Sequence, residues 1–135
     1  MAVQISNWLS AQLLNAALCK KPFTPPETVY LALYTSDPTP ADTGQEVTGG
    51  GYARQPIPFA LASLENGKTT NKNSTDIEFP TVTEEWGLIT HVALRTAATG
   101  GNLMWSKALG DNARTVRVGD KPKFYKDSVL VRVNQ

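Results

Sequence analysis

The 135-residue sequence has few of the residues that build cross-links and catalytic centres. It contains one cysteine, Cys19, and one histidine, His91. A disulfide within the chain is therefore excluded, as are metal sites and catalytic motifs that need several histidines. Because Cys19 falls among apolar residues of a predicted helix, we expect a small hydrophobic side chain rather than a reactive thiol.

Charge is also scarce. Charged residues make up 19% of the sequence and the formal net charge is +1, whereas soluble domains typically carry ~25% charged residues. This near-neutral balance gives no electrostatic basis for binding nucleic acid or an anionic membrane. No run approaches the roughly 20 apolar residues that cross a bilayer, and residues 1–21 lack the basic start of a signal peptide. We therefore expect a soluble chain that binds neither nucleic acid nor membrane.

The length is typical of one domain, and its first part has the pattern of a helix. Within residues 1–21, apolar residues recur at spacings of three and four and form a stripe that includes Trp8, Leu9 and Leu13. This periodicity predicts an amphipathic helix, with Ser6 or Asn7 as its N-cap. The stripe must be covered, either by the chain's own sheet or by a partner subunit, so these three residues are candidates for a protein interface.

The rest of the chain is predicted to be mainly β. Residues 22–27 form a proline-rich linker, and residues 28–135 contain seven or eight short strands separated by turn signals. Such a pattern is typical of a small β-sandwich or jelly-roll-like domain, or of a small barrel. The clearest strands alternate β-branched or aromatic residues with others, and they cover residues 28–35, 75–79 and 88–96, with 102–107 as a hairpin partner.

Two segments are less regular. Residues 52–59 carry Pro56 and Pro58, and proline cannot donate a ladder hydrogen bond, so this segment belongs at a sheet edge or in a loop. Residues 62–74 are rich in Asn, Thr and Lys and are predicted to be a polar connection.

The candidates for catalysis are weak. His91 lies in the middle of a predicted strand with no nucleophile at an obvious spacing, so we interpret it as a packed or interface histidine rather than a general base. Glu84 and Glu85 precede Trp86 in a predicted turn. A carboxylate against an indole is typical of some glycosidase acids, but adjacent turn residues point in different directions and are usually solvated. We expect no enzymatic activity.

Sites for ions and cofactors are equally poor. Asp37, Asp42 and Glu46 share one loop, yet their spacing is not that of an EF-hand, which favours solvated carboxylates over a calcium site. The run of three glycines at 49–51 lacks the remainder of a phosphate-binding motif and favours a corner or a close backbone approach. The sequence therefore predicts no metal and no cofactor.

The C-terminal part of the chain is basic. From Lys107 onward there are seven Lys or Arg residues and three Asp residues, a local excess of about four positive charges by that count. Charges on the outer faces of strands are normally solvated. The alternative is a docking face for an acidic protein surface, with Arg114, Arg117, Lys121 and Lys123 as its candidate residues.

Several segments of the chain form a specific combination: VYLALYTSDPT at 29–39, Glu46–Val47 followed by GGGYARQ at 49–55, Phe79–Pro80, Trp86–Gly87, Ile89–Thr90–His91 and AATGGNLMW at 97–105. Together they resemble a family of small tailed-phage virion proteins, described as capsid cement or decoration proteins or as tail fibre-like proteins. The resemblance covers roughly residues 29–105. It implies a β-structured component of the virion that is assembled in the cytoplasm of the bacterial host.

The resemblance leaves two places in the particle open. Cement proteins are commonly small β-subunits that sit as dimers or trimers over junctions of the shell, which suits the length of this chain. On that basis the first expectation is a capsid cement protein on the capsid surface, bound to the major capsid protein and to copies of itself. The alternative is a tail fibre or baseplate component that binds tail proteins and takes part in host attachment.

Overall fold

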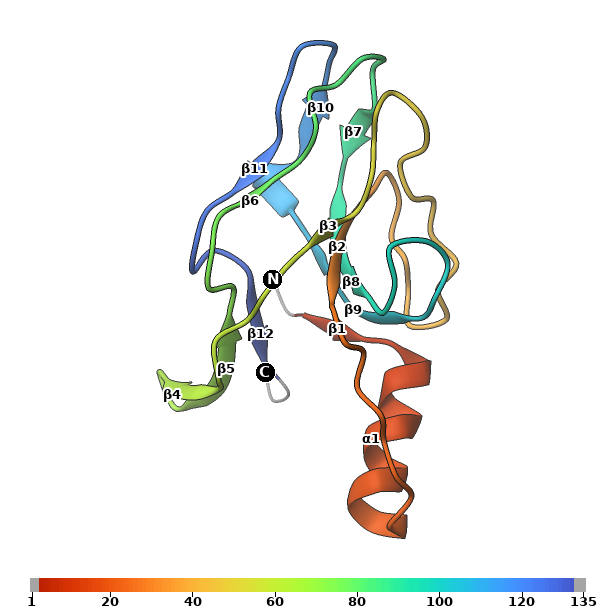
Figure 1. Cartoon of the computed structure of the whole chain (residues 1–135), viewed down its shortest axis with the longest axis vertical. Helices are drawn as coiled ribbons and strands as arrows, with labels where there is room; N and C mark the ends of the chain where they lie inside the picture. Colours follow the sequence, from red (N-terminus) through yellow and green to blue (C-terminus); the bar gives the residue numbers. More distant parts are fainter. Residues whose placement is uncertain (1–2, 133–135) are drawn as a thin grey trace.

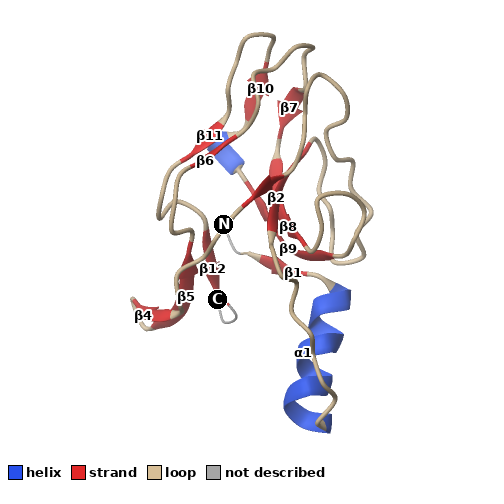
Figure 2. Ribbon diagram, in the orientation of Figure 1, coloured by secondary structure: helices blue, strands red, loops and turns tan. Residues whose placement is uncertain are grey.

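Short strands and one protruding helix make up the molecule (Figures 1 and 2). The computed structural model describes residues 3–132. Its elements, in chain order, are β1 (Gln4–Ile5), α1 (Asn7–Cys19), β2 (Tyr30–Tyr34), β3 (Gln55–Pro56), β4 (Ser63–Glu65), β5 (Lys68–Lys72), β6 (Ile77–Glu78), β7 (Gly87–Ile89), β8 (His91–Arg95), β9 (Leu103–Ala108), the 3-10 helix η1 (Gly110–Asn112), β10 (Arg114–Val116), β11 (Lys123–Phe124) and β12 (Leu130–Arg132).

The largest sheet has five strands in the order β1-β9-β8-β2-β3. Its centre is the antiparallel pair of β2 and β8, in which Leu31 lies opposite Leu94 and Leu33 opposite Val92. The strand predicted over residues 28–35 is confirmed by β2, and the strand predicted over residues 88–96 is confirmed for the part that forms β8. The strand β3 lies at the edge of the sheet, which is where Pro56 is tolerated because an edge strand need not donate every ladder hydrogen bond.

The core lies between this sheet and three small sheets, β10-β7, β11-β6 and β12-β5-β4. Their inward side chains form one buried apolar cluster, which includes Leu31, Leu33, Leu94, Ile77, Phe79, Val116 and Val131. The other face of the large sheet buries a smaller cluster of Ala32, Tyr34, Ala93 and Leu103. The prediction of a mainly β, sandwich-like domain with an N-terminal helix is thus confirmed.

Phe79 is at the centre of an aromatic cluster within this core. Its side chain is 0% exposed. The ring of Tyr52 stacks on it with centroids 6.1 Å apart, and Trp86 and Phe124 approach edge-on at 6.3 and 6.2 Å. Offset and edge-to-face arrangements are those that aromatic quadrupoles favour. The cluster joins the loop after β2, the segment before β7, and β11 around one buried ring.

The helix is shorter than the predicted span of residues 1–21. Gln4 and Ile5 form β1 and pair with β9, where Ile5 lies opposite Trp105. The helix then begins at Asn7, because the Ser6 hydroxyl accepts a hydrogen bond from the Leu9 N–H and caps it. Among the described residues, no helix is long and apolar enough to cross a membrane.

The prediction of a polar connection at residues 62–74 is wrong. This segment forms the hairpin of β4 and β5, whose turn consists of Asn66 and Gly67 with φ of 52° and 77°. An Asn-Gly pair with positive φ at both residues is the turn that the twist of a two-residue hairpin favours. The strand β5 also pairs with β12, so the polar strand is held by ladder hydrogen bonds on both sides rather than by an apolar pattern.

The strand predicted over residues 88–96 is also divided. Residues 87–89 form β7 and pair with β10, whereas residues 91–95 form β8 in the large sheet. Thr90 lies between them, and its N–H donates to the Tyr34 carbonyl while its own carbonyl accepts from Leu109. The chain therefore passes from one sheet to another at this residue without a loop.

Candidate functional site: two protein-interaction surfaces

The predicted helix stripe is turned toward the chain itself. Leu9 is 1% exposed and belongs to the core, and Trp8 and Leu13 are half-buried against that core. The indole of Trp8 also meets the ring of Phe23 edge-on, with centroids 6.3 Å apart. Residues after the helix thus return along it (Figure 1). A role of Trp8 and Leu13 in contacts with other chains stays a prediction.

The opposite side of the helix carries a second apolar stripe. Ala11, Leu14 and Leu18 fall on one helical face, all three are exposed, and the exposed fractions of Leu14 and Leu18 are 58% and 77%. We call these three residues the outer helix stripe. No Asp, Glu, Lys, Arg or His occurs in the first 19 residues, so α1 carries no formally charged side chain. The three-and-four spacing of these residues is visible in the sequence. It was not singled out there, because the stripe with Trp8, Leu9 and Leu13 already explained the helical periodicity.

The four basic candidate residues do not form one patch. Arg114, Lys121 and Lys123 border a groove of about 820 Å³, whereas Arg117 does not line it. The Lys121 amine lies 3.2 Å from the Glu78 carboxylate, and the Lys123 amine lies 3.6 Å from that of Asp76. Three of the four residues therefore border a hollow instead of forming an open basic surface, and their role in docking stays a prediction.

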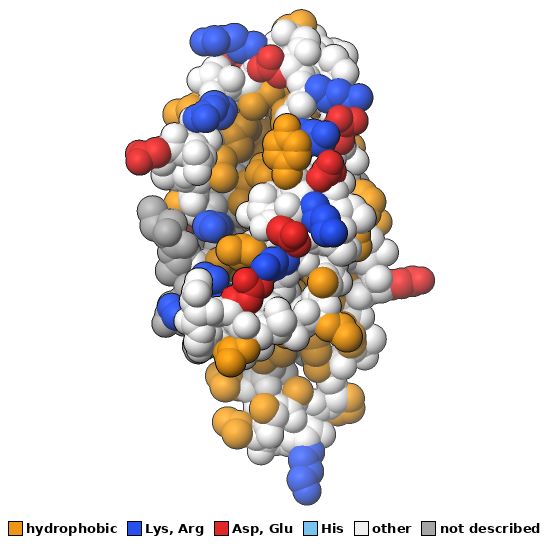
Figure 3. Space-filling model, turned by 90° about the vertical axis from the view of Figure 1, so that its left-hand side faces the viewer, with side chains coloured by type: hydrophobic (Ala, Val, Ile, Leu, Met, Phe, Trp, Pro, Cys, Tyr) orange, Lys and Arg blue, Asp and Glu red, His pale blue; other side chains and the backbone are white. Residues whose placement is uncertain are grey.

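The lining of this groove is largely apolar. Its apolar residues come from the large sheet, from β7 and β10, and from the C-terminal segment, and they include Leu33, Ile89, Val92, Leu109, Val116, Phe124 and Val129. The space-filling view shows hydrophobic side chains within a hollow between basic side chains on this side of the molecule (Figure 3). An apolar groove with charged edges has the composition of a protein-binding site.

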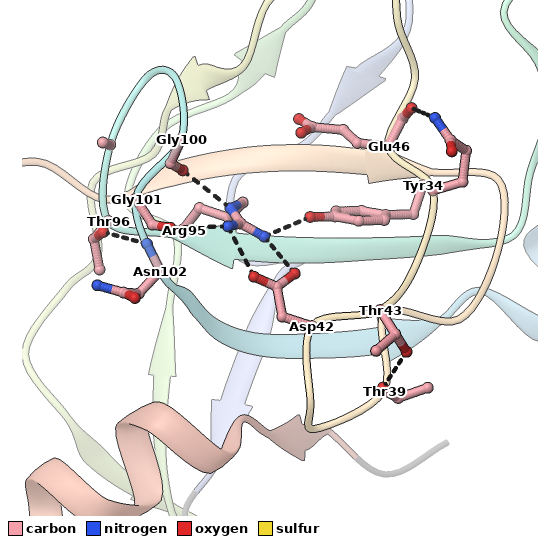
Figure 4. Close-up of polar contacts among 12 residues, drawn as sticks. Tyr34, Thr39, Asp42, Thr43, Glu46, Arg95, Thr96, Gly100, Gly101 and Asn102 are labelled. Atoms are coloured by element: carbon pink, nitrogen blue, oxygen red, sulfur yellow. Dashed lines mark hydrogen bonds and ion pairs between the residues drawn. The ribbon is translucent and has the colours of Figure 1, made fainter.

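Two buried arginines, which the sequence analysis did not single out, organise the loops beside the large sheet. The guanidinium of Arg95 donates to both carboxylate oxygens of Asp42, at 2.8 and 3.0 Å, and to the Tyr34 hydroxyl at 2.8 Å. It also donates to the carbonyls of Gly100 and Gly101 (Figure 4). Burial raises the pKa of the Tyr34 hydroxyl despite the nearby guanidinium. The loop before Glu46 is thereby fastened to the turn after β8.

Arg54 forms the second centre. It binds both carboxylate oxygens of Glu46 at 2.8 Å and donates to the carbonyls of Ala97 and Gly100. The Tyr52 hydroxyl donates to the same carboxylate at 2.6 Å. Burial alone would raise the pKa of Glu46, but the hydrogen bonds from Arg54 and Tyr52 and the charge of Arg54 outweigh it and lower the pKa.

These contacts account for the acidic residues of the loop. Asp42 and Glu46 are paired with arginines, and Asp37 accepts a hydrogen bond from the Thr39 N–H. Among residues 3–132, no group of three or more acidic, His or Cys side chains is placed to hold a metal ion. Calcium binding by Asp37, Asp42 and Glu46 is therefore not supported.

The remaining candidates differ in their exposure. Glu84 and Glu85 are exposed, whereas Trp86 is buried, as expected for solvated turn carboxylates. His91 is half-buried, with its Nδ1 2.8 Å from the Thr90 hydroxyl oxygen. Cys19 is exposed at the end of α1, and not packed as a small hydrophobic residue, because the end of the helix extends beyond the β-sheets (Figure 2).

The run of three glycines is a close backbone approach, as predicted. The Trp86 Nε1–H donates to the Gly50 carbonyl at 2.9 Å. A Cβ on Gly50 would lie 2.5 Å from the Glu84 carbonyl oxygen, and its φ is 61°. Only glycine fits here without strain. This corner of the chain therefore positions the buried indole of Trp86.

Comparison with known proteins identifies a family for this chain. A family model described as "Podophage GP4 fiber I protein gp80" matches residues 4–132. No curated protein matches the sequence. The matched span includes α1, all four sheets and both surfaces described above, and it confirms the resemblance to tailed-phage virion proteins. The chain belongs to the family of the podophage GP4 fiber I protein gp80.

Proposed function

We propose that this chain is a structural subunit of a phage fibre, which acts by binding neighbouring protein chains. The observation that supports the proposal most is the match of a fibre-protein family over residues 4–132. The fold is suited to such a role, because a small β-domain with a protruding helix and a basic-rimmed groove offers two separate contact surfaces. We infer that the subunit works without catalysis, since the family that it matches is described by a fibre protein, which is a structural component.

The family favours the fibre over a capsid cement protein. Length, the N-terminal helix and the proline-rich linker made capsid cement, bound to the major capsid protein on the capsid surface, the first expectation from the sequence. The description of the family names a fibre instead, and it supports the alternative of a tail fibre or baseplate component. The proposed partners are accordingly other fibre or tail proteins and copies of the chain itself.

The position in the particle can be tested by gold labelling of intact virions with an antibody against this chain. We expect label on fibres at the tail end of the particle. Quantitative mass spectrometry of the same particles should give far fewer copies than of the major shell protein. Label spread evenly over the head, with a copy number close to that of the shell protein, would instead establish a cement protein.

The outer helix stripe is the surface that we assign to self-association. Ala11, Leu14 and Leu18 are apolar and exposed, and apolar side chains on one helical face are buried when a second such face packs against them. The absence of Asp, Glu, Lys, Arg and His from α1 allows two identical faces to meet without like-charge repulsion. Self-association into dimers or trimers through this stripe completes the proposal.

Changing both leucines of the stripe should weaken self-association. We expect Leu14→Glu with Leu18→Glu to raise the dissociation constant at least about hundredfold, because two carboxylates would have to be desolvated in the contact. Analytical ultracentrifugation measures this change. The matched control is Leu61→Glu, which alters a leucine that is 95% exposed outside the helix and should leave association unchanged. Equal loss in the control would remove the stripe from the interface.

A further inference from the structure

The groove lies between two consecutive strands that do not pair with each other. β10 and β11 are separated only by residues 117–122, yet β10 pairs with β7 and β11 pairs with β6. The turn between them is fixed, since the Asp120 N–H donates to the Arg117 carbonyl and the Asp120 carboxylate accepts from the Arg117 N–H. The two strands therefore diverge after the turn, and residues of both strands line the groove.

Each of these strands pairs with another strand along one edge alone. In the described part of the chain, β10 and β11 each have a single partner strand. An unpaired strand edge offers N–H and C=O groups to an extended segment of another chain. A groove of about 820 Å³ lies within the range of roughly 300–1,000 Å³ that holds a compact ligand or a short run of side chains.

The charges around the groove favour a partner with negatively charged side chains. Four basic side chains line it, Lys107, Arg114, Lys121 and Lys123, against the single carboxylate of Asp120. That carboxylate already accepts a hydrogen bond in the turn. Lys121 and Lys123 have carboxylate partners outside the groove lining, whereas within residues 3–132 neither Lys107 nor Arg114 forms an ion pair. The apolar lining requires apolar side chains, and the rim favours acidic ones beside them.

We propose that this groove binds an extended segment of a partner protein in which apolar residues are flanked by Asp or Glu. The apolar side chains would occupy the space over Val116, Phe124 and Val129. The carboxylates would meet Lys107 and Arg114 at the rim, and the backbone would lie beside an unpaired strand edge. The inference deepens the proposed fibre role, because it assigns a site and a partner chemistry to the binding of a neighbouring chain.

Titration of the 15N-labelled full chain with synthetic peptides tests this site. The probe is a ten-residue peptide that alternates Val with Glu, and the comparison peptide has Lys in place of Glu. We expect the acidic peptide to shift the amide signals of Val116, Phe124 and Val129, and its affinity to fall as salt is raised. The basic peptide should bind at least about tenfold more weakly.

Two variants with equal changes of charge separate the groove from the rest of the surface. Lys107→Glu with Arg114→Glu should weaken binding of the acidic peptide by about tenfold or more. Lys20→Glu with Lys21→Glu, at the exposed end of α1, should not change it. Thr115→Trp, which fills the groove from an exposed position, should also reduce binding, and circular dichroism checks that each variant is folded.

Several results would overturn the inference. Signal shifts confined to residues away from the groove would do so, as would equal binding of the basic peptide or tighter binding of a single-stranded DNA oligonucleotide. These outcomes do not depend on where the chain sits in the particle. A failure of the gold-labelling experiment would contradict the fibre role alone, and a failure of the peptide titration would contradict the groove site alone.

Discussion

Replacing Phe79 with alanine should lower the free energy of unfolding by about 4 kcal/mol, since removal of a fully buried aromatic ring costs roughly 3–5 kcal/mol. The ring is 0% exposed and contacts the rings of Tyr52, Trp86 and Phe124. Its loss leaves a cavity lined by rings from three segments that are far apart in the sequence. Urea denaturation followed by tryptophan fluorescence measures the change.

The choice of control separates cavity formation from loss of aromatic contact. Phe79→Leu retains most of the volume and should cost less than the alanine variant by about 2 kcal/mol or more. Phe124→Ala removes a half-buried ring at the margin of the same cluster and should fall between the two. If Phe79→Ala were destabilising by less than about 1 kcal/mol, the cluster could not be the centre of the core.

Replacing Glu46 with alanine is expected to cost about 3 kcal/mol. The Arg54 side chain is 8% exposed. Without Glu46, its guanidinium keeps only the carbonyls of Ala97 and Gly100 as hydrogen-bond partners. The Tyr52 hydroxyl loses its acceptor as well. Removal of one member of a buried ion pair is strongly destabilising because the other charge stays buried. Glu84→Ala, at an exposed carboxylate, should change the free energy of unfolding by less than about 0.5 kcal/mol.

The same pair predicts a dependence of stability on pH. The pKa of Glu46 in the folded chain lies below its ordinary value, which is about 4.3 in an unfolded chain. Its contribution to stability is therefore complete above about pH 4.3, and it is lost as the pH falls through the lower, folded-state pKa. We expect the difference between wild type and Glu46→Gln to shrink below about pH 4 in parallel urea titrations. A difference that stays constant with pH would mean that the carboxylate charge does not stabilise the fold.

The parts of the fold that the sequence predicted well are those with a strong local pattern. The strands Tyr30–Tyr34 and His91–Arg95 have apolar side chains buried on both faces of the large sheet, and the three-and-four spacing in Asn7–Cys19 reflects the face that buries Leu9. The strand β5 has no such face, because Lys68–Lys72 is polar and is held by backbone pairing on both sides. The Asn66–Gly67 pair indicates the turn of its hairpin. The polar composition of residues 62–74 instead favoured the prediction of a connection.

The candidate surfaces were predictable only in part. Basic residues of the C-terminal segment indicated a docking face, but the groove exists because β10 and β11 pair with different strands. No local pattern encodes that divergence. The arginine centres were also hidden, since Arg54 and Arg95 meet Glu46 and Asp42 only after the intervening strands bring the loops together. Ion pairs of this kind depend on distances in space, and spacing along the chain does not give them.

The scarcity of charge on α1 has a consequence for how the two surfaces would respond to temperature. Contacts made by an uncharged apolar stripe weaken on cooling, because the hydrophobic driving force near room temperature is entropic. A contact at the basic rim is instead screened by dissolved ions. Chilling should therefore loosen the association of copies through Leu14 and Leu18 while the groove keeps its ligand, and added salt should release the ligand while the copies stay together.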